Sequence, residues 1–379
     1  MIRQTVAHVD LEAIRSNYRA IAAFVGASRT RAPGSAPSAS PAIIAVVKAN
    51  AYGHGAPQVA VALEQAGAAM LACADIEEAI VLRDAGVRLP ILVFGALSIS
   101  NLDGIFRHAL TPTISTPGAA RALQTAAERH GVRLRCHLKI DTGMNRLGFR
   151  HDNLPRTLPE VAAAPNLEIA AVYTHFATAD NPDHPAFALQ RERFDTVLGQ
   201  LPSLGIPASV RHAANSAALL RDERIWYDFV RPGLMLYGIV PPPLMATLPL
   251  RPALSLRSRI VAVKGIRPGE GTGYGLGGVL DRAARIAVVP AGYADGLDLR
   301  LAGRGYMLVR GRRVPIVGSV CMDMTMIDVT GTDVAPGDEV VIVGEQDGES
   351  IGMREMAAAI GTIPYELLCR VGSRIQRVY

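Results

Sequence analysis

The stretch AIIAVVKANAYGHG, residues 42–55, is a short apolar run with Lys48 at its end, followed by a glycine-rich turn. Similar apolar runs, separated by longer amphipathic stretches, recur over roughly the next 200 residues, which is the pattern of parallel strand–helix units. Eight runs are found, at residues 43–47, 70–73, 91–94, 110–114, 134–140, 167–173, 208–212 and 228–230. Eight such units predict an α/β fold, a (β/α)8 TIM-like barrel.

Helical patterns lie between these runs, at residues 57–69, 75–86, 118–131 and 186–200. The second of them opens with Asp75 and has Glu78 three residues later, a pair that resembles a capping box. An open, doubly wound sheet is the main alternative fold. It is less favoured because no GxGxxG follows the first run.

The pattern changes at the proline-rich stretch 239–254, which is typical of a linker. Beyond it, short alternating runs at 256–263, 285–289, 306–309, 314–317, 324–328 and 339–343 predict a mostly antiparallel β domain, with one helix at 353–360. We therefore expect a barrel domain over residues 1–243 and a β domain over residues 244–379. The segment 28–42, rich in Pro, Ser, Gly and Ala, is predicted to be a surface loop.

The charge distribution and the cysteines limit the class of protein. The net charge is +5, but the arginines are scattered, so we expect no nucleic-acid partner. The four cysteines lack CxxC spacing, which indicates reduced thiols and no metal site. No apolar stretch has the length of a signal core or a membrane span, and we expect a cytoplasmic protein without a membrane partner.

Lysine is rare in this chain, which has three lysines and 36 arginines. Arginine holds its proton too tightly to act as a nucleophile, whereas a lysine amine can be tuned for that purpose. Lys48, Lys139 and Lys264 are therefore candidates for amine chemistry, although chance retention is the simpler explanation for any one of them.

Polar residues gather where the predicted barrel strands end, and barrel active sites are built at that face. They are Lys48, Lys139, Asp141, Arg146, His175, Asn215, Ser216 and Arg231, and Gly233 follows the last of them. The last two loops supply a hydroxyl and backbone N–H groups beside a glycine, which suits a phosphate. A lysine opposite a phosphate seat suggests pyridoxal phosphate held as a Schiff base.

Each of these residues also has an ordinary structural explanation. His175 could be a hydrogen-bonded core histidine, Arg231 could form a salt bridge, and Lys139 could pair with Asp141. Asn215 and Ser216 could simply cap the next helix. The glycine-rich stretch GEGTGYGLGG, residues 269–278, lacks the GK[ST] ending of a nucleotide loop and is expected to be a turn.

Eight motifs follow one another along the chain: AVVKANAYGHG, HLKIDTGMNRLGF, YTHFATAD, HAANSAA, RPGLMLYG, GTGYG, GYADG and CMDMTMIDV. Together they closely resemble the bacterial alanine racemases, from near residue 5 to the C-terminus except for the 28–42 loop. The resemblance implies a pyridoxal-phosphate enzyme that interconverts L- and D-alanine, either for peptidoglycan or for alanine catabolism. It also implies a homodimer with shared active sites.

The resemblance assigns two catalytic residues. Lys48 would hold the cofactor as an internal aldimine and, once released by substrate, act as the base on the D-face. Tyr274 of the partner subunit would be the base on the opposite face. A racemase needs two such bases, because one removes the Cα proton and the other returns a proton from behind. Free tyrosine has a pKa of about 10, so Tyr274 needs a proton relay, which in the family includes the residues matched by His175 and Arg231.

Further roles are implied by the same matching or by position at the strand ends. Arg231 would face the pyridine nitrogen and, because arginine only donates hydrogen bonds, would leave that nitrogen unprotonated, which favours racemisation over transamination. Lys139 would be carbamylated, as in some members, and would pair with Arg146. The cofactor-binding set is Lys48, Tyr52, Arg146, His175, Asn215, Ser216, Arg231, Gly233, Leu234 and Tyr365. Arg146 and Met322 of the partner subunit would contact substrate, and Lys139, Tyr293 and Asp323 would support the site or its entrance.

Three alternative functions share parts of this pattern. A barrel-fold amino-acid decarboxylase would need an acidic partner for the pyridine nitrogen, where this chain has Arg231. It would also need a catalytic cysteine from the C-terminal domain, and Cys321 is a cysteine of that domain. A non-catalytic pyridoxal-phosphate carrier would lack the second domain. A racemase of broader specificity, acting on serine or lysine, is the nearest alternative.

Overall fold

The computed structural model describes residues 5–29, 40–97, 102–207 and 209–379. The chain forms two compact units. The barrel unit contains Ile14–Ala51 and Ala56–Arg251, and the β unit contains the described residues up to Ala13 together with Tyr52–Gly55 and Pro252–Tyr379. Most of the 28–42 loop, and Ala208 at the start of the predicted seventh strand, lie outside the described residues.

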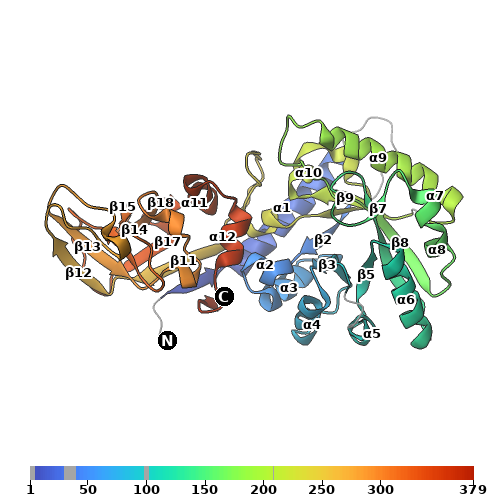
Figure 1. The fold of residues 1–379 in the computed structure, drawn as a ribbon, viewed down its shortest axis with the longest axis horizontal. Coiled ribbons are helices and arrows are strands. Elements are labelled where there is room, and N and C mark those ends of the chain that lie inside the picture. The colour runs from blue at the N-terminus through green and yellow to red at the C-terminus, as the bar shows by residue number, and fades with distance from the viewer. Residues whose placement is uncertain (1–4, 30–39, 98–101, 208) are drawn as a thin grey trace. The chain divides into compact units, whose positions relative to one another are not determined.

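The described part of the barrel unit contains a closed ring of eight parallel strands, as predicted (Figure 1). Neighbouring strands pair in the order β5-β4-β3-β2-β10-β9-β8-β6, and β5 also pairs with β6, which closes the ring. A two-residue strand, β7 (Phe149–Arg150), adds to β6. The ring strands are β2 (Ala42–Val46), β3 (Met70–Cys73), β4 (Ile91–Val93), β5 (Thr111–Ile114), β6 (Leu134–Asp141), β8 (Leu167–Tyr173), β9 (Arg211–Asn215) and β10 (Phe229–Arg231).

Helices alternate with these strands along the chain. Asp75 begins α4 as predicted, because its side chain accepts a hydrogen bond from the Glu78 N–H. Thr116 caps α6 in the same way. The helices are α3 (Ala56–Gln65), α4 (Ile76–Asp84), α5 (Asp103–Arg107), α6 (Pro117–Arg129), α7 (Leu154–Thr157), α8 (Pro159–Ala162), α9 (Ala186–Gln200) and α10 (Ser216–Arg221), and a 3-10 turn, η4 (Leu234–Tyr237), follows β10.

The helix α1 (Leu11–Arg29) precedes the first barrel strand and, from Ile14 onward, belongs to the barrel unit. Its Tyr18 hydroxyl donates to the Gly67 carbonyl, after α3, and its Asn17 amide donates to the Leu236 carbonyl, after β10. The helix is thus fastened to both neighbours of β2. Its place in the barrel is set by these long-range contacts.

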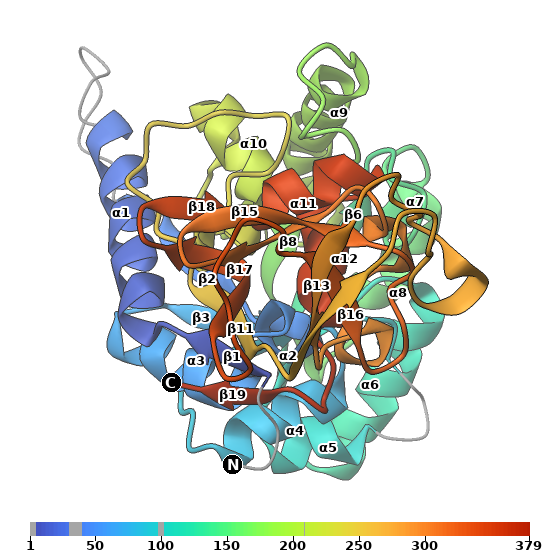
Figure 2. The same cartoon turned by 90° about the vertical axis from the view of Figure 1, so that its left-hand side faces the viewer.

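The β unit is built on one mixed sheet with the strand order β12-β13-β16-β15-β14-β17-β11-β1-β19 (Figure 2). All of these pairs are antiparallel except β1 with β19. The strands are β1 (Val6–Val9), β11 (Leu254–Arg259), β12 (Ala262–Ile266), β13 (Ala284–Val289), β14 (Tyr306–Val309), β15 (Arg312–Val317), β16 (Thr325–Asp328), β17 (Glu339–Gln346) and β19 (Gln376–Val378), and β18 (Glu349–Ile351) pairs with β17. Helix α11 (Met353–Ile360) has the predicted bounds, and α12 (Pro364–Arg370) follows it.

Some elements differ from the prediction. The run 256–263 is two strands, because the chain changes partners there: the Ile260 N–H bonds to Asp338 and the Val261 N–H bonds to Val288. The seventh barrel strand ends at Asn215 rather than at His212, so Asn215 is its last residue. The first strand, expected in the barrel domain, pairs with β11 and β19 in the β unit.

The described residues contain no helix with both the length and the apolar character that a membrane crossing requires.

Candidate active site

The barrel brings the predicted polar residues to one face, the carboxyl ends of its strands. Lys48 comes two residues after β2, Lys139 and Asp141 are in the last part of β6, and His175 comes two residues after β8. Asn215 and Arg231 are the last residues of β9 and β10. The strands are parallel and closed into a ring, so these ends share one rim.

Lys48 precedes a left-handed turn. Ala49, Asn50 and Ala51 have φ and ψ values of 53° and 53°, 52° and 46°, and 54° and 51°, and Tyr52 has a φ of 51°. A left-handed conformation costs an L-residue about 1–2 kcal/mol, and only glycine and, to some extent, asparagine adopt it easily. Such strain persists only where the surroundings hold it, and it is commonest at functional sites.

Arg231 is buried, with 3% of its surface exposed. Its guanidinium donates to the carbonyls of Thr174 and Ala213, both at 2.9 Å, and to Nδ1 of His212 at 2.8 Å. It forms no ion pair with any residue that the structure describes, so the salt-bridge explanation of Arg231 does not hold. Burial lowers its pKa to about 10, and the group therefore stays charged near neutrality.

Two buried histidines extend the hydrogen-bond chain from Arg231 into the barrel. Arg231 donates to Nδ1 of His212, so His212 carries its proton on Nε2 and donates it to Nδ1 of His137 at 3.0 Å. Burial lowers the pKa of His137 to about 3 and that of His212 well below its ordinary value. Both rings are therefore neutral, and their tautomers follow from the arginine's donation.

Tyr173 forms the wall behind this chain. Its ring stacks on His212 with 4.6 Å between centroids, and the Arg231 guanidinium lies 5.3 Å from the Tyr173 centroid. Lys139 Nζ lies 5.6 Å from the same centroid. Stacking and cation–π contacts hold these groups in fixed relative positions.

Lys139 is buried, with 5% of its surface exposed. Burial, together with the charges of Arg146 and Arg231, lowers its pKa to about 8. No described carboxylate lies within 4.0 Å of its amine, so the simple pairing with Asp141 is not formed. Asp141 instead accepts the backbone N–H groups of Gly143, Met144 and Asn145 at 3.0–3.1 Å through Oδ1, which shapes the turn that carries Arg146.

His175 is half-buried at the centre of this group. Removal of its ring from water lowers its pKa well below the ordinary value, and the charges of Arg231, Lys139, Arg146 and Lys48 act in the same direction. Arg231 Nη2 approaches His175 Nδ1 at 3.4 Å. The four cations are therefore close enough to act on one imidazole. An excess of positive charge at one rim favours binding of an anion.

The loops after β9 and β10 carry the residues that the sequence predicts as a phosphate site. Ser216 is buried, and its hydroxyl accepts the Gly233 N–H at 2.9 Å, which holds the two loops together. Asn215 caps α10 by accepting the Ala218 N–H at 2.9 Å, so its capping explanation is correct. Hydroxyl and backbone N–H groups beside a glycine are suited to phosphate oxygens.

The remaining predicted residues belong to the β unit. Tyr274 is 79% exposed, on a loop closed by the Thr272 N–H bond to Gly277 and by the Ser319 hydroxyl bond to the Tyr274 carbonyl. Met322 is 50% exposed, and Asp323 pairs with Arg374 at 2.6 Å. Tyr52 is buried, with its ring centroid 6.0 Å from that of Tyr365, and burial raises the pKa of Tyr52.

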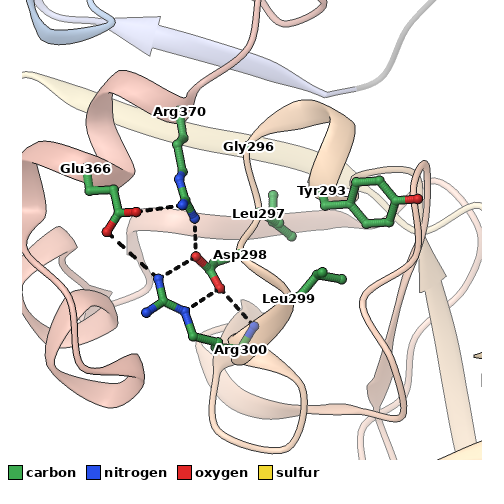
Figure 3. Close-up of a pocket in the computed structure, with 8 residues that line it drawn as sticks. All are labelled: Tyr293, Gly296, Leu297, Asp298, Leu299, Arg300, Glu366 and Arg370. Carbon is green, nitrogen blue, oxygen red and sulfur yellow. Dashed lines mark hydrogen bonds and ion pairs between the residues drawn. The ribbon is translucent and has the colours of Figure 1, made fainter.

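Tyr293 borders a hollow of about 650 Å³ in the β unit (Figure 3). The buried carboxylate of Asp298 binds Arg300 at 2.8 Å and also pairs with Arg370, and Glu366 accepts from Arg370 at 2.6 Å. The hydrogen bond from Arg300 holds the pKa of Asp298 well below its ordinary value. The two carboxylates and the two guanidinium groups balance one another in charge here, whereas positive charge is in excess at the barrel rim. The hollow is lined by Tyr293, Gly296, Leu297, Asp298, Leu299, Arg300, Glu366 and Arg370.

Sequence reasoning missed His137, His212 and Tyr173 as members of the site. All three stand inside quoted motifs, but nothing in their spacing distinguishes a site residue from an ordinary core residue. Glu78, expected only to cap a helix, also accepts a hydrogen bond from the backbone N–H of Ala49, the residue after Lys48.

A barrel rim with a lysine, a serine hydroxyl beside a glycine, and a buried arginine that has no carboxylate partner among the described residues has groups suited to pyridoxal phosphate. The fold and the site thus define a barrel-fold pyridoxal-phosphate enzyme. Two family models match the chain: "Alanine racemase, N-terminal domain" over residues 9–241 and "Alanine racemase, C-terminal domain" over residues 253–379. The chain belongs to the alanine racemase family and is a pyridoxal-phosphate-dependent isomerase.

Individual relatives match along the whole chain. The alanine racemase of Carboxydothermus hydrogenoformans is 42% identical over 383 residues, which is 100% of both chains. The solved alanine racemase of the D-cycloserine producer Streptomyces lavendulae is 36% identical, with a TM-score of 0.92 over 100% of this chain and 97% of that one. The solved enzyme of Bartonella henselae, with covalently bound pyridoxal phosphate, is 28% identical, with a TM-score of 0.86 over 99% of both chains.

Proposed function

We propose that this protein interconverts L- and D-alanine, with Lys48 and Tyr274 of the partner subunit as the two bases. The main support comes from the rim of the barrel. The charges of Lys48, Lys139, Arg146 and Arg231 all lower the pKa of His175 there, and Arg231 has no ion pair among the described residues. Such a rim suits two anions, the phosphate of the cofactor and the carboxylate of an amino acid. The family membership supports alanine as the substrate.

The proposed binding residues follow from their places in each unit. Lys48 forms the covalent link, and the anion seat of Ser216, Gly233 and Leu234 receives the phosphate. Tyr52 and Tyr365, whose rings are neighbours, assist there. Asn215 positions the start of α10 beside the seat. The bound cofactor supplies an electron-withdrawing ring that makes the substrate Cα proton removable.

Arg231 is proposed to face the pyridine nitrogen. It stays charged, because its pKa of about 10 is well above neutrality, and it has only donors to offer. An arginine there weakens the electron withdrawal of the ring, which favours simple return of a proton to Cα. A carboxylate in the same place would favour decarboxylation or transamination, which speaks against the decarboxylase alternative.

The two bases are proposed to lie on opposite faces of the substrate. Lys48 takes the proton of D-alanine, and Tyr274 of the partner subunit takes that of L-alanine. The high exposure of Tyr274 supports a role toward a second chain, and Leu276, Met322 and Met324 nearby are exposed as well. His175, kept neutral and next to Arg231, is suited to relay the proton of the tyrosine.

Further residues complete the proposal. Arg146 binds the cofactor's phenolic oxygen and the substrate carboxylate, assisted by Met322 of the partner subunit. Lys139, with its lowered pKa, becomes a carbamate that pairs with Arg146. Tyr293 and Tyr365 narrow the entrance, which Asp323 helps to orient, and the narrow entrance favours a methyl side chain. A cytoplasmic location and a role in peptidoglycan or alanine catabolism remain predictions.

The test is a panel of L-amino acids incubated with the holoenzyme, followed by chiral analysis. We expect L-alanine to approach an equal mixture of enantiomers much faster than L-serine or L-lysine. Borohydride reduction should attach the cofactor to Lys48. Attachment to Lys139 or Lys264, or a preference for a larger amino acid, would contradict the proposal.

A further inference from the structure

A single carboxylate contacts the backbone directly after Lys48. The Ala49 N–H, which belongs to the peptide bond formed with Lys48, donates to Oε1 of Glu78 at 2.6 Å. The other oxygen, Oε2, accepts the Ala74 N–H at 2.8 Å. Glu78 thereby connects the loop that follows β2 with the loop that follows β3. Its own N–H is held by Asp75 at 2.8 Å, so the carboxylate starts from a fixed helix end.

This contact differs from ordinary helix capping. In a capping box, the glutamate at the third helical position returns to the backbone N–H of the capping residue, here Asp75. The oxygens of Glu78 instead accept from Ala74 and Ala49, and Ala49 lies 29 positions away in sequence. Glu78 therefore serves the lysine loop as well as its own helix.

The lysine loop requires such an external contact. Ala49, Asn50, Ala51 and Tyr52 all have positive φ, which L-residues avoid, so the loop must be held by its surroundings. The Asn50 side chain accepts the Ala56 N–H at 2.8 Å, and the Ala51 N–H bonds to the Val47 carbonyl at 2.9 Å. These contacts hold the end and the middle of the loop, whereas Glu78 holds the peptide group next to Lys48.

We propose that Glu78 is a positioning residue for Lys48, because its carboxylate fixes the Lys48–Ala49 peptide plane and so directs the amine at the substrate Cα. This inference rests on the proposed role of Lys48 as the base toward D-alanine. Both oxygens are needed, since two backbone N–H groups from different loops must be accepted at once. A glutamine offers one oxygen and places its NH2 group against the other donor.

Loss of the Glu78 contact should affect proton removal from one enantiomer. If the lysine is poorly directed, removal of the proton from D-alanine becomes more rate-limiting, whereas removal from L-alanine by Tyr274 of the partner subunit does not. The deuterium isotope effect on kcat with Cα-deuterated D-alanine should therefore rise in Glu78→Gln. The effect for L-alanine should not rise, because Lys48 acts in that direction only by returning a proton after Tyr274 has removed one. Misplacement of a reacting group by about 1 Å can cost 100-fold in rate, so we expect kcat to fall at least about 10-fold with KM less affected.

Glu77→Gln is the matched control, because it removes the same charge from the neighbouring, exposed position of α4. Wild type and both variants are compared as holoenzymes with equal cofactor content and thermal unfolding profiles. Should Glu78→Gln fail to fold, Glu78→Asp takes its place, since aspartate keeps the charge but is too short to reach both donors. Isotope effects equal to wild type in the Glu78 variant, or equally altered in Glu77→Gln, would overturn the inference.

A second variant tests the strain itself. Glycine adopts positive φ without steric cost, so Ala49→Gly removes part of the need for the carboxylate. We expect Ala49→Gly to recover part of the lost kcat in the Glu78→Gln background and to give no gain alone. Equal effects in both backgrounds would count against the inference. Absence of alanine racemisation by wild type would contradict the proposed function instead, so the two failures are distinct.

Discussion

Lys139 is buried next to other cations and has no carboxylate partner among the described residues. Its charged ammonium form is therefore disfavoured. A carbamate forms from a neutral amine and carbon dioxide, with release of a proton, and it replaces a positive group by a negative one. At Lys139 this change would turn repulsion of Arg146 and Arg231 into attraction. The carbamate of Lys139 would then be a negative group among the cations of the rim.

We expect Lys139 to bind carbon dioxide reversibly. With a pKa of about 8, roughly half of the amine is neutral at pH 8 and about a tenth at pH 7, so carbamate formation should rise over this range. Carbon-13 NMR with labelled bicarbonate should show a carbamate signal that Lys139→Arg abolishes and Lys264→Arg, at an exposed lysine, keeps. A signal that survives in Lys139→Arg would rule out this residue.

At the scale of elements, Asp298 connects two parts of the β unit. It lies on the segment that follows Tyr293 and binds Arg300 beside it and Arg370 at the end of α12 (Figure 3). Helix α12 also carries Tyr365, whose ring is close to Tyr52. A buried carboxylate thus fixes the segment after Tyr293 against α12, the helix that carries Tyr365.

We expect Asp298→Asn to destabilise the β unit by about 3 kcal/mol, the lower end for breaking a buried ion pair, because both arginines are partly exposed. The pKa of Asp298 is depressed, so its stabilisation is full above its unfolded value of about 4 and is lost as the pH falls through the folded value. Denaturant unfolding of wild type and Asp298→Asn should therefore converge at low pH. A constant difference down to pH 2 would exclude this origin.

Asp323→Asn is a suitable control for this experiment. Asp323 also pairs with an arginine, Arg374, but its side chain is 54% exposed. Exposed pairs contribute about 0–1 kcal/mol, so this variant should unfold almost like wild type.

At the scale of the whole molecule, the proposed site is complete only when two chains meet. Lys48 is in the barrel unit, whereas Tyr274 lies on an exposed loop of the β unit. Apolar side chains beside Tyr274 are exposed, such as Leu276 at 68%. Neighbouring exposed apolar side chains suit contact with a second copy of the chain.

We expect Tyr274→Phe and Lys48→Ala each to lose racemase activity, with Tyr274→Phe losing the 100- to 10,000-fold that a general acid–base group contributes. Mixed subunits of the two variants should regain activity, because one site in each heterodimer then has both native residues. The measurement is alanine racemisation after co-refolding or co-expression with two affinity tags. Lack of recovery in a purified heterodimer would mean that the two residues serve the same chain's site.

Much of this protein could be predicted from residues close together in sequence. The apolar runs, the capping pair Asp75 and Glu78, and the lysine after the first run all depend on local periodicity and side-chain chemistry, and they indicated the barrel and a lysine-bound cofactor. The break between β11 and β12 was missed, because a change of strand partner is decided by distant chain segments. The short helix α12 was missed as well.

The sequence by itself determined the eight-stranded barrel, the second β domain, the family and the candidate bases, because these are recorded in periodicity and in ordered motifs. Only the tertiary structure decided that Arg231 is buried without a described carboxylate partner, that His212 and His137 extend its hydrogen bonds, and that Glu78 holds the strained loop after Lys48. These properties arise from contacts between residues far apart in the chain. They depend on strand register and burial, which a single sequence does not specify.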